Sequence, residues 1–155
     1  MNSESIGKGE DITQPGDSIE QRQAEKWLLD ALSDKLGAKL TTKKIELDGA
    51  IYIQLDGCCE SPSILCEAWS HIGPPKSAQK NKVMTDALRL LFANETIGGN
   101  AQCILLFADR DAAAPFIGNT WMAQCLKKYS IRVEVIEFPP EIKTKVLKAQ
   151  KRQYR

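Results

Sequence analysis

The hydrophobic pattern of the chain begins with a helix. Apolar residues recur every three or four positions from about residue 18 to residue 36, which is helical spacing. Gly37 then fits the carboxyl end of this helix. Residues 1–17 carry almost no apolar side chain, so we expect a disordered leader followed by one folded domain over residues 18–155.

Three short apolar runs follow, and each is typical of a β-strand. Residues 43–48 and 51–56 flank Gly49, and the Asp-Gly dipeptide there predicts a hairpin. Residues 57–62 are rich in turn-forming side chains and predict a turn. Residues 63–69 then form the third predicted strand.

The second half of the chain alternates helices with strands. A helix capped by Ser77 is predicted to end before Gly98, and the continuous apolar run 103–108 is typical of a strand buried on both faces. The remaining predicted elements are a loop at Asp109, Arg110 and Asp111 with Asp111 as a candidate helix cap, a helix from Asn119 or Thr120 to Tyr129, a strand at 131–138, and a helix after Pro140. The order α-β-β-β-α-β-α-β-α predicts a three-layer α/β domain, in which helices flank a mixed β-sheet.

Charge is balanced over the whole chain and uneven along it. The formal net charge is +1, so the molecule as a whole is not a polyanion binder by composition. The segment 140–155 has six basic residues against one acid, which favours an anion-binding helix. A solvated helix face explains the same residues equally well.

Cysteine usage and hydropathy bear on the compartment. Five cysteines, an odd number without zinc-type spacing, indicate free thiols in a reducing environment. No apolar run approaches the ~20 residues that span a bilayer, and no signal peptide is apparent. We therefore expect a cytoplasmic protein that does not enter membranes.

Two acidic residues in strand-like runs are the strongest candidates for chemistry. Asp56 ends the second predicted strand, and Glu67 lies inside the third. Adjacent carboxylates repel unless a cation lies between them, and Mg²⁺ prefers such oxygen ligands. Glu20 or Glu25 on the first helix is a candidate for a further ligand. Taken singly, each acid is more typical of a structural role, Asp56 in an Asp-Gly turn and Glu67 on a solvent-facing edge strand, and it is the pair together that favours a metal site.

The element order with these two acids resembles the PD-(D/E)xK restriction-endonuclease-like superfamily. The resemblance covers about residues 18–108, and it rests on Asp56 of the second strand and Glu67 of the third. The family's lysine would fall two residues after the glutamate, where this chain has Trp69. Divergent members take this lysine, or a glutamine, from the following helix, where the candidates are Gln79, Lys80 and Lys82.

The resemblance implies a Mg²⁺-dependent (or Mn²⁺-dependent) nuclease acting on DNA. Its implied catalytic residues are Asp56, Glu67, and Lys82 or Gln79, and its metal ligands are Asp56, Glu67 and Glu20. The basic residues that we expect to contact DNA phosphates are Lys76, Lys80, Lys148, Lys151 and Arg152.

Two alternatives belong to other classes of function. The fold could act as a catalytically inactive binding or assembly module, with Trp69 marking a lost active site and a homodimer or partner protein as its context. A small-ligand pocket near Asp109 is the third hypothesis. His71 is either a general base or a structural residue, and Asp86 with Arg89 is interpreted as a salt bridge within one helix.

Overall fold

The elements alternate much as the sequence predicts. The computed structural model describes residues 19–153, so the predicted leader lies outside the described residues. The elements are α2 (Ile19–Leu36), β1 (Thr41–Glu46), the 3-10 turn η1 (Asp48–Ala50), β2 (Tyr52–Glu60), β3 (Ser63–Trp69), α3 (Ser77–Thr96), β4 (Gln102–Phe107), α4 (Arg110–Ile117), α5 (Trp121–Lys128), β5 (Ile131–Val135) and α6 (Pro140–Gln153).

The five strands form one mixed sheet in the order β1-β2-β3-β4-β5. The first three strands are antiparallel, because short turns join them. β3, β4 and β5 are parallel, because helices cross over between them. The predicted α/β class with helices on both sides of a mixed sheet is confirmed.

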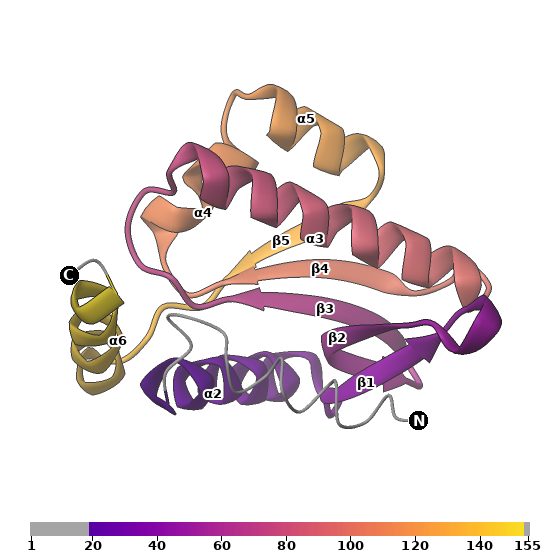
Figure 1. Cartoon of the computed structure of the whole chain (residues 1–155), viewed down its shortest axis with the longest axis horizontal. Helices are drawn as coiled ribbons and strands as arrows, with labels where there is room; N and C mark the ends of the chain where they lie inside the picture. The colour runs from indigo at the N-terminus through magenta and orange to yellow at the C-terminus, as the bar shows by residue number, and fades with distance from the viewer. Residues whose placement is uncertain (1–18, 154–155) are drawn as a thin grey trace.

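Two apolar layers hold the helices to the sheet. On one face, Leu65 and Phe107 pack under α3, α4 and α5. On the other face, Cys66 and Leu106 pack against α2, and α6 lies beside α2 (Figure 1). The buried Gln150 of α6 also binds the backbone of Ile72, accepting from its N–H at 2.7 Å and donating to its carbonyl at 3.1 Å.

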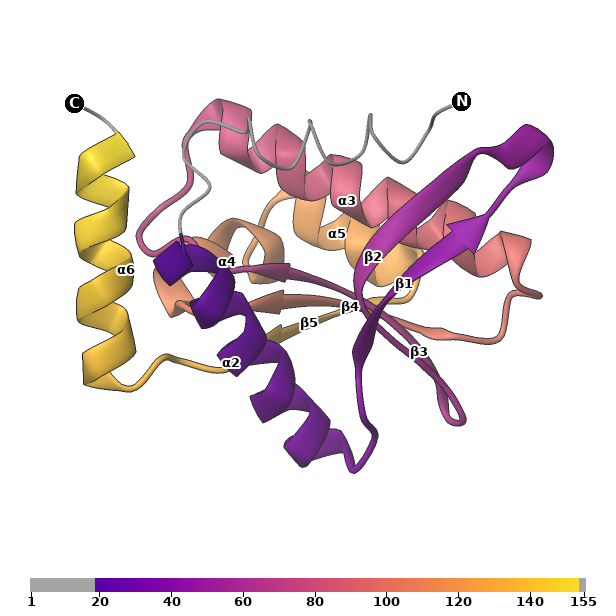
Figure 2. The same cartoon turned by 60° about the horizontal axis from the view of Figure 1, so that its bottom comes forward.

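The first hairpin extends beyond the body of the sheet. In Figure 2, β1 and the first part of β2 form an arm that turns away from β3 and β4. Among the helices of residues 19–153, none is long and apolar enough to cross a bilayer.

The predicted turn at 57–62 is wrong. β2 continues to Glu60, and the reversal is confined to Ser61 and Pro62, which are joined by a cis peptide bond. Cys58 and Cys59 therefore belong to the strand, where they pair with Leu65 and Ile64.

The predicted loop at 109–111 is also wrong. Residues 110–117 form α4, and the Asp109 side chain, not that of Asp111, caps it by accepting from the Ala112 N–H at 3.2 Å. The acidic and basic residues that suggested a loop are the first turn of a helix built on three alanines. The last strand is shorter than predicted and ends at Val135.

Candidate functional site

Asp56 lies at a β-bulge. Thr41 of β1 pairs with Cys58 and Lys43 pairs with Leu55, so two steps along β1 match three steps along β2. A bulge bends its strand and redirects a side chain. The Asp-Gly dipeptide therefore makes a bulge here and not a turn, and it directs Asp56 toward β3.

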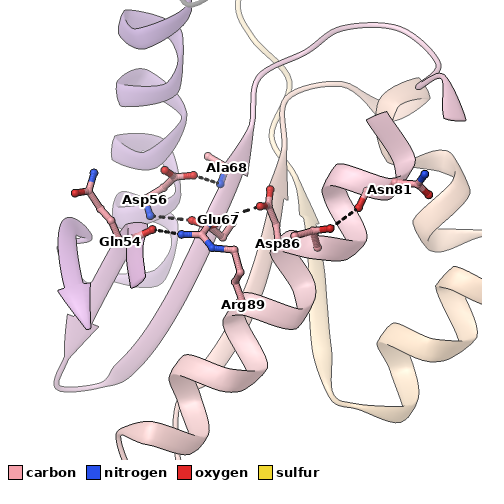
Figure 3. Close-up of polar contacts among 8 residues, drawn as sticks. Gln54, Asp56, Glu67, Ala68, Asn81, Asp86 and Arg89 are labelled. Atoms are coloured by element: carbon pink, nitrogen blue, oxygen red, sulfur yellow. Dashed lines mark hydrogen bonds and ion pairs between the residues drawn. The ribbon is translucent and has the colours of Figure 1, made fainter. Parts of the chain in front are cut away.

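β2 and β3 part at this bulge. Their pairing ends at Gly57 and Cys66. Beyond it, carboxylates replace backbone carbonyls as acceptors: the Asp56 N–H donates to Glu67 Oε1 at 3.0 Å, and the Ala68 N–H donates to Asp56 Oδ2 at 2.8 Å (Figure 3). We call this place, with Asp56 and Glu67 from the strands and Asp86 and Arg89 from α3, the fork.

Arg89 joins the three elements of the fork. Its Nη1 contacts Glu67 Oε2 at 2.5 Å, and its Nη2 donates to the Gln54 carbonyl at 2.6 Å. Asp86 lies 3.6 Å from the same guanidinium, as the predicted pair within one helix requires. The shorter contacts cross to the sheet (Figure 3), so Arg89 is the main counter-charge of Glu67.

The carboxyl groups of the fork are poorly compensated. Burial, followed by the negative charges of Asp56 and Asp86, raises the pKa of Glu67 to about 8, against the opposing effects of the Asp56 N–H and Arg89. Burial also raises the pKa of Asp56 and the pKa of Asp86, although Arg89 and Lys82 act in the other direction on both. Three acids thus share two nearby cations, and such perturbed groups gather at functional sites.

The packing of α3 on β3 brings Lys82 to the fork. Glu67 contacts Arg89, and His71 contacts Gln79 at 3.1 Å, so the helix runs against the direction of the strand. Along the chain, Trp69 lies between Glu67 and His71. Lys82 lies between Gln79 and Arg89, the helix residues that contact them. Lys82 precedes Asp86 by about one turn of α3, and its charge opposes the rise in the pKa of Asp56 and in the pKa of Asp86.

Gln79 is engaged elsewhere. Its Oε1 accepts from the Lys76 N–H at 2.8 Å, so the cap of α3 lies at Lys76 and the prediction of Ser77 as the cap is wrong. With Oε1 so held, its Nε2 donates to His71 Nε2, which requires a neutral imidazole at this contact. Burial lowers the pKa of His71, in agreement with that state. Gln79 is therefore a positioning residue of the helix start in this arrangement.

A groove leads to Asp56 from the side of α2. Its volume is about 690 Å³. Glu25 lines it together with Asp56, whereas Glu20 lies on the other flank of α2, where it binds Arg152 at 3.0 Å. Of the two helix acids considered from the sequence, Glu25 is thus the one that shares a groove with Asp56.

The basic residues separate into three places. Lys76 and Lys80 lie at the start of α3. Lys148 and Arg152 line a groove of about 380 Å³ between α2 and α6, and Lys151 lines a second groove along α6, of about 450 Å³. The basic side chains in the groove of Asp56 are ones that the sequence analysis missed, namely Arg22, Lys26 and Lys39.

The carboxylate oxygens of the fork suit a hard cation, provided that Glu67 gives up one of its present contacts. Mg²⁺ is commonly held by one or two carboxylates together with waters and substrate phosphates. Asp56 and Glu67 supply such oxygens, but both oxygens of Glu67 are already engaged, by the Asp56 N–H and by Arg89. Within residues 19–153 no three His, Cys, Asp or Glu side chains are grouped for metal binding.

Comparison of the chain with protein-family models, with curated proteins and with solved structures finds no match. The described residues define an α/β domain with an acidic fork between two strands.

Proposed function

We propose that this protein is a nuclease-like domain that hydrolyses phosphodiester bonds in DNA with Mg²⁺ or Mn²⁺. The observation that carries the proposal is the fork, where the carboxylates of Asp56 and Glu67 meet beside a groove. The positive charge of Arg89 and Lys82 does not balance the acids there. The resemblance to the PD-(D/E)xK superfamily points to the same reaction. The five cysteines are free thiols, in keeping with a cytoplasmic location.

The two strand acids of the fork, Lys82 and the residues that line the groove each have a role in this proposal. Asp56 and Glu67 would hold the metal, with Glu25 as a further acid in the groove. When bound, the metal would polarise the phosphodiester and lower the pKa of a water. Lys82 would stabilise negative charge that develops on the phosphate. Arg22, Lys26 and Lys39 would contact the DNA backbone from the walls of the groove.

Cleavage assays with charge-removing variants test the proposal. Asp56→Asn keeps an acceptor for the Ala68 N–H, so we expect a folded protein without metal-dependent cleavage. Lys82→Gln should lower the rate by roughly a hundredfold, the usual cost of losing one group that stabilises developing charge. Lys128→Gln, at an exposed position near the end of α5, is the matched control and should cleave like the parent. Cleavage retained by Asp56→Asn would contradict the assignment.

A second candidate is a catalytically inactive module of the same fold that binds nucleic acid or assembles with a partner. Trp69 in the lysine position and the closed contact of Arg89 with Glu67 favour it. It predicts no cleavage with any divalent metal, and a melting temperature that Mn²⁺ does not raise. A metal that binds only the folded state must raise that temperature.

A further inference from the structure

One guanidinium occupies the side of Glu67 that a metal would need. Arg89 Nη1 lies 2.5 Å from Glu67 Oε2, and the remaining carboxylate oxygen accepts from the Asp56 N–H. Glu67 is 4% exposed, whereas Arg89 is 36% exposed. Arg89 therefore covers the buried carboxylate from the solvent side and keeps a path to solvent itself.

The same side chain has room to leave. Arg89 borders a groove of about 710 Å³ that continues along the second half of α3, with Phe92 and Glu95 on its wall. An aromatic face and a carboxylate are both favourable neighbours for a guanidinium. The hydrogen bond to the Gln54 carbonyl would be lost in this move, since that carbonyl belongs to β2.

The charges of the fork favour an exchange. Within residues 19–153, the guanidinium of Arg89 is the cation that contacts Glu67 and Asp86, at 2.5 Å and 3.6 Å, and Asp56 adjoins Glu67 through its N–H. A divalent ion would bring two charges to the place where the guanidinium brings one. A guanidinium that stays beside the metal position lowers the affinity for the metal by repulsion. It also occupies Glu67 Oε2, an oxygen that the metal would need.

We propose that Arg89 is a self-blocking counter-ion: it takes the place of the divalent cation at Glu67 in the metal-free protein, and metal binds only as Arg89 leaves Glu67. This inference rests on the proposed function, because it requires the metal to bind at Asp56 and Glu67. It makes Arg89 a regulator of metal affinity and not a ligand.

Calorimetric titration with Mn²⁺ alone tests the inference without any cleavage assay. Arg89→Gln removes the charge and keeps a side chain that can donate to Glu67. We expect it to bind Mn²⁺ about tenfold or more tightly than the parent, because one repelling charge within a few ångströms is lost. Arg132→Gln is the matched control, since it removes an arginine from Glu134, the other buried glutamate, and should leave Mn²⁺ affinity unchanged.

The outcomes separate the two proposals. Equal or weaker Mn²⁺ binding by folded Arg89→Gln, with binding abolished by Asp56→Asn and Glu67→Gln together, would overturn the role of Arg89 and leave the metal site intact. No binding by either the parent or Arg89→Gln would overturn both. If Arg89→Gln does not fold, Arg89→Lys serves instead. Arginine contacts Glu67 and the Gln54 carbonyl with two separate nitrogens, whereas lysine has a single nitrogen and should hold Glu67 less firmly. Lysine keeps the positive charge, so the expected gain in Mn²⁺ affinity is smaller than for Arg89→Gln, and an unchanged or weaker affinity overturns the inference.

Discussion

Two buried glutamates of the sheet have opposite surroundings. Glu67 on β3 has one arginine and two acidic neighbours, and its pKa is raised to about 8. Glu134 on β5 is bound by Lys35 at 2.9 Å and by the guanidinium of Arg132. Burial raises the pKa of Glu134 as well, but the hydrogen bonds and charges of these two cations outweigh it, and the pKa is lowered.

The comparison shows that burial alone does not mark a site. The two side chains are 4% and 10% exposed, and each contacts an arginine. They differ in the charges around them. Two cations balance the negative charge of Glu134, whereas Glu67 has one cation in contact and two further acids nearby. A buried acid with its cations in place is a structural ion pair, whereas one without them is a candidate for binding a further cation.

The largest expected loss at a single pH comes from removing the counter-charge of the fork. At about pH 9, Arg89→Met should lower the free energy of unfolding by about 3 kcal/mol, because an ionised Glu67 is left buried without the guanidinium that contacts it. At about pH 6 the loss should shrink to about 1 kcal/mol, since Glu67 then holds a proton. Adding Glu67→Gln should recover most of the stability at pH 9, and urea denaturation at both pH values measures each difference. An equal loss at both pH values would contradict the account.

The pH dependence of stability should follow Glu67. Its folded pKa of about 8 lies above its ordinary value of 4.5, so the folded protein binds more protons between these values. The stability that Glu67 contributes is therefore fully present below pH 4.5, and it is lost as the pH rises through about 8. Between about pH 5 and pH 8, the parent should lose roughly 3 to 4 kcal/mol relative to Glu67→Gln. Parallel urea titrations of the two proteins that keep a constant difference would sink this prediction.

Neutralising either buried glutamate gives the smallest expected changes in stability, and the two changes should have opposite signs. At about pH 8, Glu134→Gln should lower the free energy of unfolding by about 1 kcal/mol, because two partly exposed ion pairs are lost. Glu67→Gln should be neutral or stabilising by up to about 1 kcal/mol, because it relieves repulsion with Asp56 and Asp86. Its amide oxygen still accepts from the Asp56 N–H, although the contact with Arg89 is lost. Thermal melts of both variants beside the parent measure the signs. Destabilisation of the same size in both would remove the distinction between the two sites.

Much of the fold follows from local patterns. The run 103–108 is predicted as a doubly buried strand, and the helix from residue 77 is predicted by its apolar spacing, because both patterns depend on neighbours in sequence. α4 was missed because the charged residues at its start, Arg110 and Asp111, resemble a loop, and Pro115 within it argues against a helix.

The site depends on features that sequence does not carry. Asp56 and Glu67 were predicted to meet, and they do. The bulge that directs Asp56 is not predicted, because Asp-Gly is also typical of a turn, which is the alternative that the sequence leaves open there. Arg89 was assigned to its own helix, and its contact with Glu67 follows only from the packing of α3 on β3. A basic residue one turn from an acid on a helix, with a strand acid nearby, is the weak signal that could have indicated it.

The most direct test of the account is Mn²⁺ titration by calorimetry of the parent, of Arg89→Gln and of the double variant Asp56→Asn, Glu67→Gln, with Glu134→Gln as the control. The account predicts a single site in the parent, a tighter one in Arg89→Gln, no site in the double variant, and parent-like binding in the control. Binding that survives the double variant, or its absence from both the folded parent and Arg89→Gln, would contradict a cation site at the fork.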